Sequence, residues 1–349
     1  DTDYSLRVEG ASLRETLSFR TGRESCALSV RDFGAAGGGV TDDTNAVQFA
    51  VSSLPAGGRL YFPAGRYLVR PLSLKSRITI ELAEGAVLLG CPDRAQYPIV
   101  PGTVPDMDGG ADVHFGGFEG EARPMYQSLL TAQYAEDITI VGPGTVDGNA
   151  QNSDFWTKYK EFPTVRPRLL FFNRCKNVTL HGVHVRNSPS WQIHPYYSER
   201  VALYDLRISA PKNSPNTDAI DPESCDGVEI IGCRFAVGDD CIAIKSGKIE
   251  LGTRLNQPAI RHTIRNCLMD HGHGAVTLGS EIGAGVRNLS VSQCWFRGTD
   301  RGLRIKSRRG RDMGELRGAI KSAVSNYLFK STKRSPMVIP IIMNTAGRK

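Results

Sequence analysis

The chain has 349 residues, 40% of them hydrophobic and 23% charged, which is ordinary for a globular protein. No apolar run approaches the ~20 residues that a membrane-spanning helix needs, so we expect no membrane partner. Lysine and arginine outnumber aspartate and glutamate by 43 to 36, which gives a net charge of +7 and a pI near 9.0. This charge favours an anionic partner, and because no nucleic-acid-binding module is recognisable, we expect that partner not to be a nucleic acid.

The first predicted element is a helix within residues 42–54. Its apolar residues recur at helical spacing, and Asp43 or Thr44 is available as the N-cap. An amphipathic helix at this place would cover the open end of a stack of repeats, as terminal caps do in solenoid proteins. Its apolar face consists of Ala46, Val47, Ala50, Val51 and Leu54.

Short β-rich segments follow the helix at 58–69, 76–90 and 137–148. We interpret them as faint copies of a repeat that becomes clear further along the chain. The stretch 91–135 contains Pro, Gly and Asp throughout, and we predict that it is a loop that forms a wall of a substrate cleft.

From residue 177 onward the chain repeats one pattern, a short alternating stretch, a small or polar pair and further apolar residues. Aligning the five copies gives steps of 23, 27, 34 and 27 residues between Val178, Val201, Val228, His262 and Leu289. Strands at such variable steps are typical of coils that must stack because one coil cannot bury its own apolar face. We therefore predict an all-β fold, a right-handed single-stranded parallel β-helix with an N-terminal capping helix.

The eight cysteines form neither a CxxC pair nor a zinc-type spacing with histidine, so we expect no structural metal site. Whether the cysteines form disulfide bonds stays an open question, because an even number of cysteines does not establish such bonds. In the alignment Cys233, Cys267 and Cys294 fall in one column, which we interpret as small buried residues stacked in the core.

Four short motifs occupy the same part of successive coils. Because neighbouring strands lie about 4.8 Å apart, they would form one patch about 15 Å tall. Arg304 and Lys306 are separated by one residue, so both side chains lie on the same face of a strand. The adjacent Asp239 and Asp240 can lie on one face only if the chain bends between them and the preceding strand, which Gly238 permits. The motifs are Asn216-Thr217-Asp218, Gly238-Asp239-Asp240, Gly272-His273-Gly274 and Arg304-Ile305-Lys306.

Three acids crowded beside two cations suit the hydrolysis of a glycosidic bond. One carboxyl must keep a proton for the leaving oxygen while another stays ionised to activate water. Crowding of like charges raises one pKa, and nearby arginine and lysine lower the others. Each motif alone is most often a turn, but their matched offsets in four coils favour a functional site.

In this order the four motifs resemble the signature of glycoside hydrolase family 28, the polygalacturonases and their relatives. Residues 32–50 also resemble the N-terminal segment of that family and of other pectin-active β-helix proteins. The chain departs from the family at Ala219, where glycine is frequent, and by having only one further coil, 322–344, after Arg311. We expect a single catalytic domain over 1–349 that is shortened at its C-terminal end.

The resemblance implies the roles of the site residues. Asp239 would be the general acid, with His273 supporting its proton state, and Asp218 and Asp240 would activate water with inversion at the anomeric carbon. It implies no metal and no other cofactor. The substrate-binding residues would be Arg304 and Lys306, which hold the galacturonate carboxylate, together with Asn216 and Lys245.

The implied reaction is hydrolysis of α-1,4-glycosidic bonds between galacturonate units of polygalacturonate or pectin. The segments 187–199 and 216–225 look more like exo-acting bacterial members, so we favour exo action. Trp191, Tyr196 and Tyr197 are candidates for stacking on sugar rings or for core packing. We expect a monomer that is secreted or periplasmic. The chain opens with a polar, acidic stretch and no secretory signal, which suits a processed chain as well as a trimmed one.

Three alternatives stay open at this point. A rhamnogalacturonan or xylogalacturonan hydrolase would keep the acids, although Arg304 with Lys306 argues for a uronate at the cleaved bond. A non-catalytic β-helix that only binds a polysaccharide would not need three converging aspartates. A calcium-dependent lyase would lose its activity with a chelator and release an unsaturated product.

Overall fold

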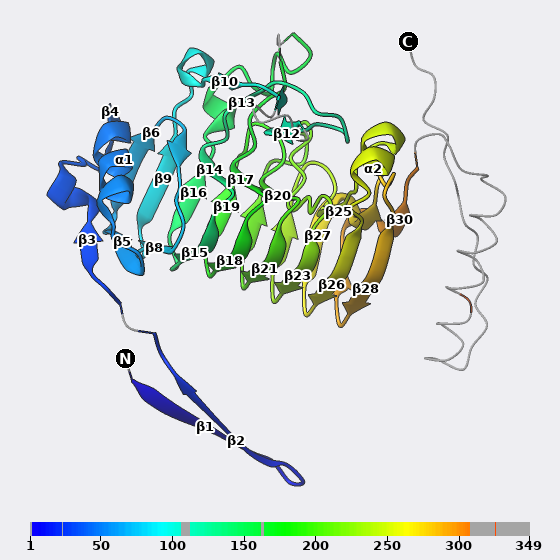
Figure 1. Cartoon of the computed structure of the whole chain (residues 1–349), viewed down its shortest axis with the longest axis horizontal. Helices are drawn as coiled ribbons and strands as arrows, with labels where there is room; N and C mark the ends of the chain where they lie inside the picture. Colours follow the sequence, from blue (N-terminus) through cyan, green and yellow to red (C-terminus); the bar gives the residue numbers. More distant parts are fainter. Residues whose placement is uncertain (1, 23, 106–111, 162–163, 308–324, 326–349) are drawn as a thin grey trace.

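The computed structural model describes residues 2–22, 24–105, 112–161, 164–307 and 325. Figure 1 shows a stack of parallel strands that runs from the α1 end to the β28 end, with a separate hairpin at the N-terminus. The stack is a right-handed parallel β-helix, so the predicted fold class is confirmed. No helix of the described chain is long and apolar enough to cross a membrane.

The hairpin consists of β1 (Asp3–Glu9) and β2 (Arg14–Arg20), which pair antiparallel. All residues of both strands are exposed, and the hairpin lies apart from the stack in Figure 1. Alternation places its large apolar side chains on one face, where Tyr4 stacks on Phe19 with ring centroids 5.4 Å apart. No sequence pattern predicted this hairpin.

The first sheet of the stack has nine strands, and its register agrees with the repeat alignment. Val178 is opposite Val201, Val201 is opposite Val228, and His262 is opposite Leu289. In stack order the strands are β3 (Ala27–Ser29), β5 (Gly58–Phe62), β8 (Ile78–Leu82), β15 (Glu136–Val141), β18 (Lys176–His181), β21 (Glu199–Tyr204), β23 (Asp226–Ile231), β26 (Ala259–Arg265) and β28 (Val286–Ser292).

The second sheet follows the first in every coil after a tight corner. Its strands are β4 (Gly38–Asp42), β6 (Gly65–Val69), β9 (Ala86–Gly90), β16 (Thr145–Asp147), β19 (His184–Arg186), β22 (Arg207–Ser209), β24 (Arg234–Ala236), the first part of β27 (Leu268–Leu278) and β29 (Trp295–Phe296).

The third sheet begins with β7 (Leu72–Ser73), β14 (Leu130–Gln133), β17 (Leu170–Asn173) and β20 (Ile193–Tyr196). Parallel bridges join Ile193 to Ile220 and Ile220 to Ile242, so the sheet continues through the coil that contains Ile220. It ends with β25 (Ile242–Ile244), the second part of β27 and β30 (Thr299–Ile305). Its outer face carries the candidate site.

The corners between sheets use left-handed backbone at equivalent places in successive coils. The residue before the aligned valine column has φ between 53° and 72° in five of these corners, at Asn177, Arg200, Gly227, Arg261 and Asn288. Asparagine and glycine adopt this region readily, whereas arginine pays a steric cost of about 1–2 kcal/mol. The repeat is therefore specified by its turns as well as by its apolar strands.

The helix α1 (Thr44–Ser53) packs on the first coil with Val47, Ala50 and Val51 buried, which confirms the predicted cap. Asp43 occupies the N-cap position, but its side chain does not cap the helix. Its carboxylate instead accepts hydrogen bonds from the backbone N–H groups of Ala36 and Gly37, and Asp42 accepts from the Thr44 N–H at 2.9 Å. The remaining helical pieces are η1 (Val30–Phe33), η2 (Arg94–Gln96), η3 (Ala150–Asn152) and α2 (Ile249–Leu255).

The stretch 91–135 is not a loop throughout, because it ends in β14, a strand of the third sheet. The part before β14 holds two small antiparallel pairs, β10 (Ile99–Val100) with β13 (Met125–Tyr126) and β11 (Thr103–Val104) with β12 (Val113–His114). Residues 106–111 lie outside the described residues, as do 308–324 and 326–349, which include almost all of the coil predicted at 322–344.

The core is a column of apolar side chains inside the coils, and the cysteines belong to it. Cys233 and Cys267 are buried and Cys294 is half-buried at the end of their column. The Cys267 thiol has its pKa raised to about 12 by the side-chain hydrogen bond with Cys233 and by burial, so it stays protonated and unreactive. All eight cysteines are free thiols, and the column is a packing feature, as predicted.

Candidate active site

The predicted site residues come from four successive coils and meet on the outer face of the third sheet. Asp218 lies just before the Ile220 bridge, and Asp239 and Asp240 lie in the bend between β24 and β25. His273 is part of β27, and Arg304 lies near the end of β30 with Lys306 just beyond it. The stacking of coils therefore brings together residues that are up to 88 positions apart.

The three aspartates form one cluster. One carboxylate oxygen of each lies within 4.8 Å of one from each of the others, with Asp218 and Asp240 buried and Asp239 partly exposed. The bend that turns both Asp239 and Asp240 toward the site depends on Gly238, because a Cβ there would collide with the backbone oxygen of Ser214. The chain bends as the glycine predicted.

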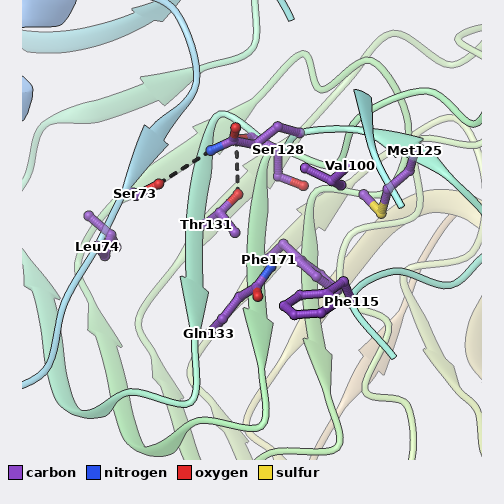
Figure 2. Close-up of a pocket in the computed structure, with 10 residues that line it drawn as sticks. Ser73, Leu74, Val100, Phe115, Met125, Ser128, Thr131, Gln133 and Phe171 are labelled. Atoms are coloured by element: carbon purple, nitrogen blue, oxygen red, sulfur yellow. Dashed lines mark hydrogen bonds between the residues drawn. The ribbon is translucent and has the colours of Figure 1, made fainter. Parts of the chain in front are cut away.

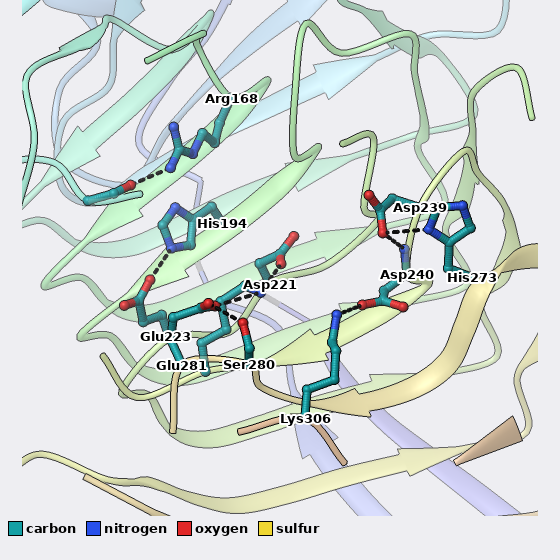
Figure 3. A network of polar contacts seen from close by, with 12 residues as sticks. Arg168, His194, Asp221, Glu223, Asp239, Asp240, His273, Ser280, Glu281 and Lys306 are labelled. Carbon is teal, nitrogen blue, oxygen red and sulfur yellow. Dashed lines mark hydrogen bonds and ion pairs between the residues drawn. The ribbon is translucent and has the colours of Figure 1, made fainter. Parts of the chain in front are cut away.

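Cations and an imidazole surround the cluster (Figure 3). The Nδ1 atom of His273 lies 3.1 Å from Oδ1 of Asp239. The ammonium of Lys306 donates to Oδ2 of Asp240 at 2.7 Å, and Nη1 of Arg304 lies 3.8 Å from Oδ1 of the same carboxylate. In the unliganded protein both cations therefore face Asp240, which reduces the net negative charge that the cluster presents to a metal ion.

The cluster separates the proton affinities of its members. Burial, followed by the negative charges of Asp239 and Asp221, raises the pKa of Asp218 well above its usual range. Burial also acts to raise the pKa of Asp239, but the hydrogen bond and charge of His273 and the charge of Lys306 outweigh it and lower that pKa. The same hydrogen bond raises the pKa of His273. The site thus favours protonation of Asp218 over Asp239, whereas the resemblance implied the acid at Asp239.

A second, buried polar network lies beside the cluster on the same sheet face (Figure 3). Nζ of Lys245 lies 3.4 Å from Oδ1 of Asp221 and 3.5 Å from Oε2 of Glu281. Glu223 pairs with His194 at 3.2 Å, and burial raises the pKa of Glu223 to about 7. These acids were missed in the sequence, although Asp221 and Glu223 are two residues apart, as side chains on one strand face are, and closely follow Asp218.

The expectation that Lys245 binds substrate conflicts with this network. Its side chain is only 5% exposed, and its ammonium is already engaged by two carboxylates and lies 4.8 Å from the centre of the Trp191 ring. Burial acts to lower the pKa of Lys245, but the charges of Glu281 and Asp221 outweigh it and keep the amine protonated. In this structure Lys245 is a buried counter-ion to these carboxylates, and its role in substrate binding stays a prediction.

Asn216 is half-buried and is held by a buried arginine. Its Oδ1 accepts a hydrogen bond of 2.5 Å from Nη2 of Arg166. The other guanidinium nitrogen, Nη1, donates to the backbone oxygens of Pro189 and Pro215 at 2.7 and 3.0 Å. Arg166 thus fixes the turn that leads into Asp218, and no motif in the sequence pointed to it.

A segment of the 91–135 stretch lies over the third sheet and extends to the coil of Asp240, where the oxygen of Gly120 accepts from the N–H of Lys248 at 3.0 Å. The oxygen of Gly117 accepts from Arg168, and the oxygen of His114 accepts from Nδ2 of Asn173 at 2.9 Å. Phe118 stacks on Trp191 with ring centroids 5.3 Å apart. We call residues 112–121 the cover segment, and its role as a wall of a substrate cleft stays a prediction.

The three candidate aromatic residues lie in the interior. Trp191, Tyr196 and Tyr197 are at most 4% exposed, so core packing describes them better than stacking on a sugar. Two hollows lie on the two sides of the cover segment. One, of about 540 Å³, adjoins Asn216. Figure 2 shows the other, of about 330 Å³, between Ser73, Thr131, Gln133, Met125 and Phe171.

Comparisons with known proteins agree on one family. The family model for glycosyl hydrolases family 28 matches residues 109–340, and a model described as rhamnogalacturonase A/epimerase, pectate lyase-like, matches residues 27–88. A probable polygalacturonase of Vitis vinifera is 35% identical over 82% of this chain and 58% of its own length. An endo-polygalacturonase of Pectobacterium carotovorum subsp. carotovorum is 28% identical over 97% of this chain and 79% of its own length.

Among solved structures, the hyperthermoactive exopolygalacturonase of Thermotoga maritima superimposes with a TM-score of 0.70. It is 31% identical, and the match covers 81% of this chain and 69% of that one. The chain spans less than three-fifths of the first two plant relatives that it matches, 58% and 56% of their lengths.

Proposed function

Because this chain belongs to family 28 of the glycosyl hydrolases, we propose that it hydrolyses the α-1,4-glycosidic bonds between galacturonate units of polygalacturonate or pectin. The observation that carries the proposal is the meeting of three carboxylates within 4.8 Å of one another beside Arg304 and Lys306. The acids supply proton donation and water activation, and the cations supply a partner for the carboxylate of a uronate.

In this mechanism Asp239 protonates the leaving oxygen, and Asp218 and Asp240 activate the attacking water. Because the unliganded site favours protonation of Asp218 over Asp239, a proton would have to pass from Asp218 to Asp239, and the two carboxylates are close enough for transfer through one water molecule. A substrate carboxylate that draws Lys306 away from Asp240 would remove part of the charge that lowers the pKa of Asp239. Substrate binding would thereby favour the protonated form of Asp239.

The stereochemical outcome depends on the spacing of the carboxyl groups. Inverting glycosidases hold their carboxyl groups about 6.5–9.5 Å apart and retaining ones about 5–5.5 Å apart. The close approach of the three aspartates taken alone favours retention, whereas the family resemblance implies inversion. We propose inversion, and proton NMR of the first product formed would test it, because β-configured reducing ends would appear first and α-configured ends would contradict it.

Exo action is supported by the cover segment, which occupies the sheet on one side of the aspartates through Arg168, Asn173 and Trp191. A polymer that lies along the stack would then reach the acids with one end only. The relatives carry the names of both endo- and exo-acting enzymes, so the product pattern decides. Chromatography during early hydrolysis would give only the shortest products for exo action and a mixture of oligomers for endo action.

The central experiment is the release of reducing ends from polygalacturonate by the purified chain, with and without a chelator. A hydrolase remains active and gives saturated products, whereas a lyase would lose activity and form products that absorb in the ultraviolet. Absence of any cleavage, together with retained polymer binding, would favour a non-catalytic binding protein. A preference for rhamnogalacturonan or xylogalacturonan over polygalacturonate would favour the other pectic hydrolases.

We further propose that the chain acts as a single catalytic domain over 1–349, as a monomer, and outside the cytoplasm, either secreted or periplasmic. The proposed location is supported by the size of the substrate, because a polymer as large as pectin does not cross a membrane. Size-exclusion chromatography would test the monomer, and fractionation of the source cells would test the location.

A further inference from the structure

The outer face of the second sheet carries none of the acids and cations of the site, but it presents a column of aligned side chains. His184 is opposite Arg207, and Arg207 is opposite Arg234. The column continues through Leu268 to Trp295 in the two coils that follow. The residue that follows each arginine is buried, so alternation along the strand points both arginines away from the core. Successive members of the column are about 4.8 Å apart along the stack.

Arg207 and Arg234 are exposed cations without a counter-ion among the residues that the structure describes. Arg186, in the coil before them, has one, because it pairs with Asp147 at 2.8 Å. Like charges that lie opposite each other on neighbouring strands are destabilising. The two arginines therefore repel each other, and a bound anion would relieve this repulsion.

The histidine at the start of the column responds to this positive charge. Nε2 of His184 lies 2.8 Å from the hydroxyl oxygen of Ser209. Burial, followed by the charges of Arg186 and Arg207, lowers the pKa of His184 to about 4. The imidazole is therefore neutral near pH 7, and the positive charge of this face comes from arginine, whose charge does not depend on pH below about 12.

The chemistry of the column suits a polymer that has a carboxylate on each sugar. An arginine binds a carboxylate through two parallel hydrogen bonds, and two arginines one coil apart can hold two carboxylates of one polymer. Trp295 is 63% exposed, with the guanidinium of Arg297 5.8 Å from its ring centroid, and it offers an aromatic face to a sugar ring. An anionic membrane gains only about 1 kcal/mol per basic residue, so two arginines would not hold the chain on a membrane.

The column lies close to the acid cluster but on a different face. Arg234 precedes Asp239 by five residues in the same coil, and the bend at Gly238 separates the second sheet from the third. Five residues span at most about 18 Å, so one polymer is long enough to contact both faces. Exposed ion pairs contribute only about 0.2–1 kcal/mol each, but a weak second contact becomes effective when the cleft already holds the same polymer.

We propose that the outer face of the second sheet is a second, non-catalytic binding surface for an anionic polysaccharide. Arg207 and Arg234 pair with carboxylates of the polymer, and Trp295 packs against one of its sugar rings. The surface holds the polymer outside the cleft and thereby keeps it near the acids between cleavages. The choice of polygalacturonate as this polysaccharide rests on the proposed function.

The test measures binding by calorimetry in an Asp239→Asn background, so that the polymer stays intact. Adding Arg207→Gln and Arg234→Gln together should raise the Kd for polygalacturonate about tenfold, which is about 1.4 kcal/mol. The Kd for trigalacturonate, which occupies only the cleft, should not change. Because the repulsion between the two arginines is removed, the melting temperature should stay the same or rise, whereas it would fall if the arginines had a structural role.

Two control variants and one control ligand accompany this test. Arg287→Gln removes an exposed arginine from β28 of the first sheet and should leave the Kd for polygalacturonate unchanged. Trp295→Ala should raise that Kd about fivefold, whereas Phe49→Ala, which removes an exposed ring from α1 at the other end of the stack, should not (Figure 1). Fully methyl-esterified pectin has no carboxylate charge, so its binding should be the same with and without the two arginines.

The outcomes separate this surface from the proposed function. If the wild-type chain cleaves nothing but the two arginine substitutions still weaken the binding of polygalacturonate, the surface is supported and only the proposed function is refuted. An unchanged Kd for polygalacturonate in a variant that keeps its melting temperature would overturn the surface, whether or not the chain is a hydrolase. An equal loss of affinity for duplex DNA would overturn the assignment of the surface to an anionic polysaccharide.

Discussion

Asp218 and Asp239 are side chains of one type, but their surroundings give them different proton affinities. Burial raises the pKa of Asp218, and His273 lowers that of Asp239. The sequence predicted that these acids meet, because their offsets in the repeat agree, but it could not predict which of them keeps the proton. That property depends on burial and on side-chain hydrogen bonds, which motif spacing does not encode.

Asp239→Asn should lower kcat on polygalacturonate by about 10²–10⁴-fold, because asparagine cannot donate the proton that the leaving oxygen needs. The amide oxygen can still accept from the backbone N–H of Asp240, now made at 2.9 Å, so the melting temperature should change little. Kinetics and thermal unfolding of the purified variant measure both effects.

The matched control for this prediction is Asp205→Asn, since Asp205 is exposed at a left-handed corner that asparagine tolerates. It should keep wild-type kcat. Turnover by Asp239→Asn within a few-fold of wild type would remove Asp239 from the acid role and move attention to Asp218.

Glu223 should make the free energy of unfolding depend on pH. Its pKa in the folded protein is raised by burial from 4.5 to about 7, so the folded state binds this proton more tightly than the unfolded state does. The stabilisation is fully present below pH 4.5 and is lost as the pH rises to about 7, by roughly 3 kcal/mol. Glu223→Gln, which has no proton to lose, should match the wild type near pH 4.5 and exceed its stability near pH 7.

Denaturant titrations of both proteins across this pH range provide the measurement. His194, whose pKa burial lowers, acts in the opposite direction, and because it is paired with Glu223, the difference between the two proteins reports on the Glu223–His194 pair. Glu84→Gln changes an exposed glutamate and should show no such difference. A constant difference between Glu223→Gln and the wild type at all pH values would contradict the assignment.

At the scale of single elements, local backbone geometry orients the side chains of the site. Gly238 lets the chain bend so that two adjacent aspartates reach the same surface. The repeat pattern predicted the strands, the corners and the capping helix, because these follow from alternation and turn chemistry. It did not predict that Asp42 would replace Asp43 as the acceptor at the start of α1, because two adjacent aspartates are equivalent to any pattern.

Gly238→Ala should lower both stability and activity, because the new Cβ would collide with the backbone oxygen of Ser214 and displace the bend. We expect a loss of about 1–3 kcal/mol in the free energy of unfolding, typical of overpacking. Gly38→Ala is the control, since a Cβ there meets no atom within 4 Å. Equal stabilities of the two variants would contradict a steric requirement at Gly238.

On the scale of the whole molecule, the cover segment decides how much of the sheet a polymer can reach. Its composition predicted a wall but not its position, since the contacts of Gly117, Phe118 and His114 are made with strands more than 50 residues away. The positions of such loops depend on tertiary contacts, and a short-period sequence pattern does not predict these contacts.

Phe118→Ala should loosen the cover segment, because it removes the stack on Trp191. We expect oligomers longer than the wild-type product to appear in early digests of polygalacturonate, as the polymer gains access along more of the sheet. High-resolution chromatography of the products measures this change, and Phe49→Ala again serves as the control. An unchanged product pattern in a variant that retains activity would mean that the cover segment does not set the mode of cleavage.

The acids and the cations of the site are distributed over successive rungs, which follow one another in the direction that we propose for the polysaccharide. The coils of the protein and the sugar units of the polymer would then repeat along the same direction, and each coil would contact one part of the ligand. A substitution in one rung changes the recognition of one sugar and leaves the neighbouring rungs intact. Such a ladder allows specificity to diverge step by step while the catalytic rung stays the same.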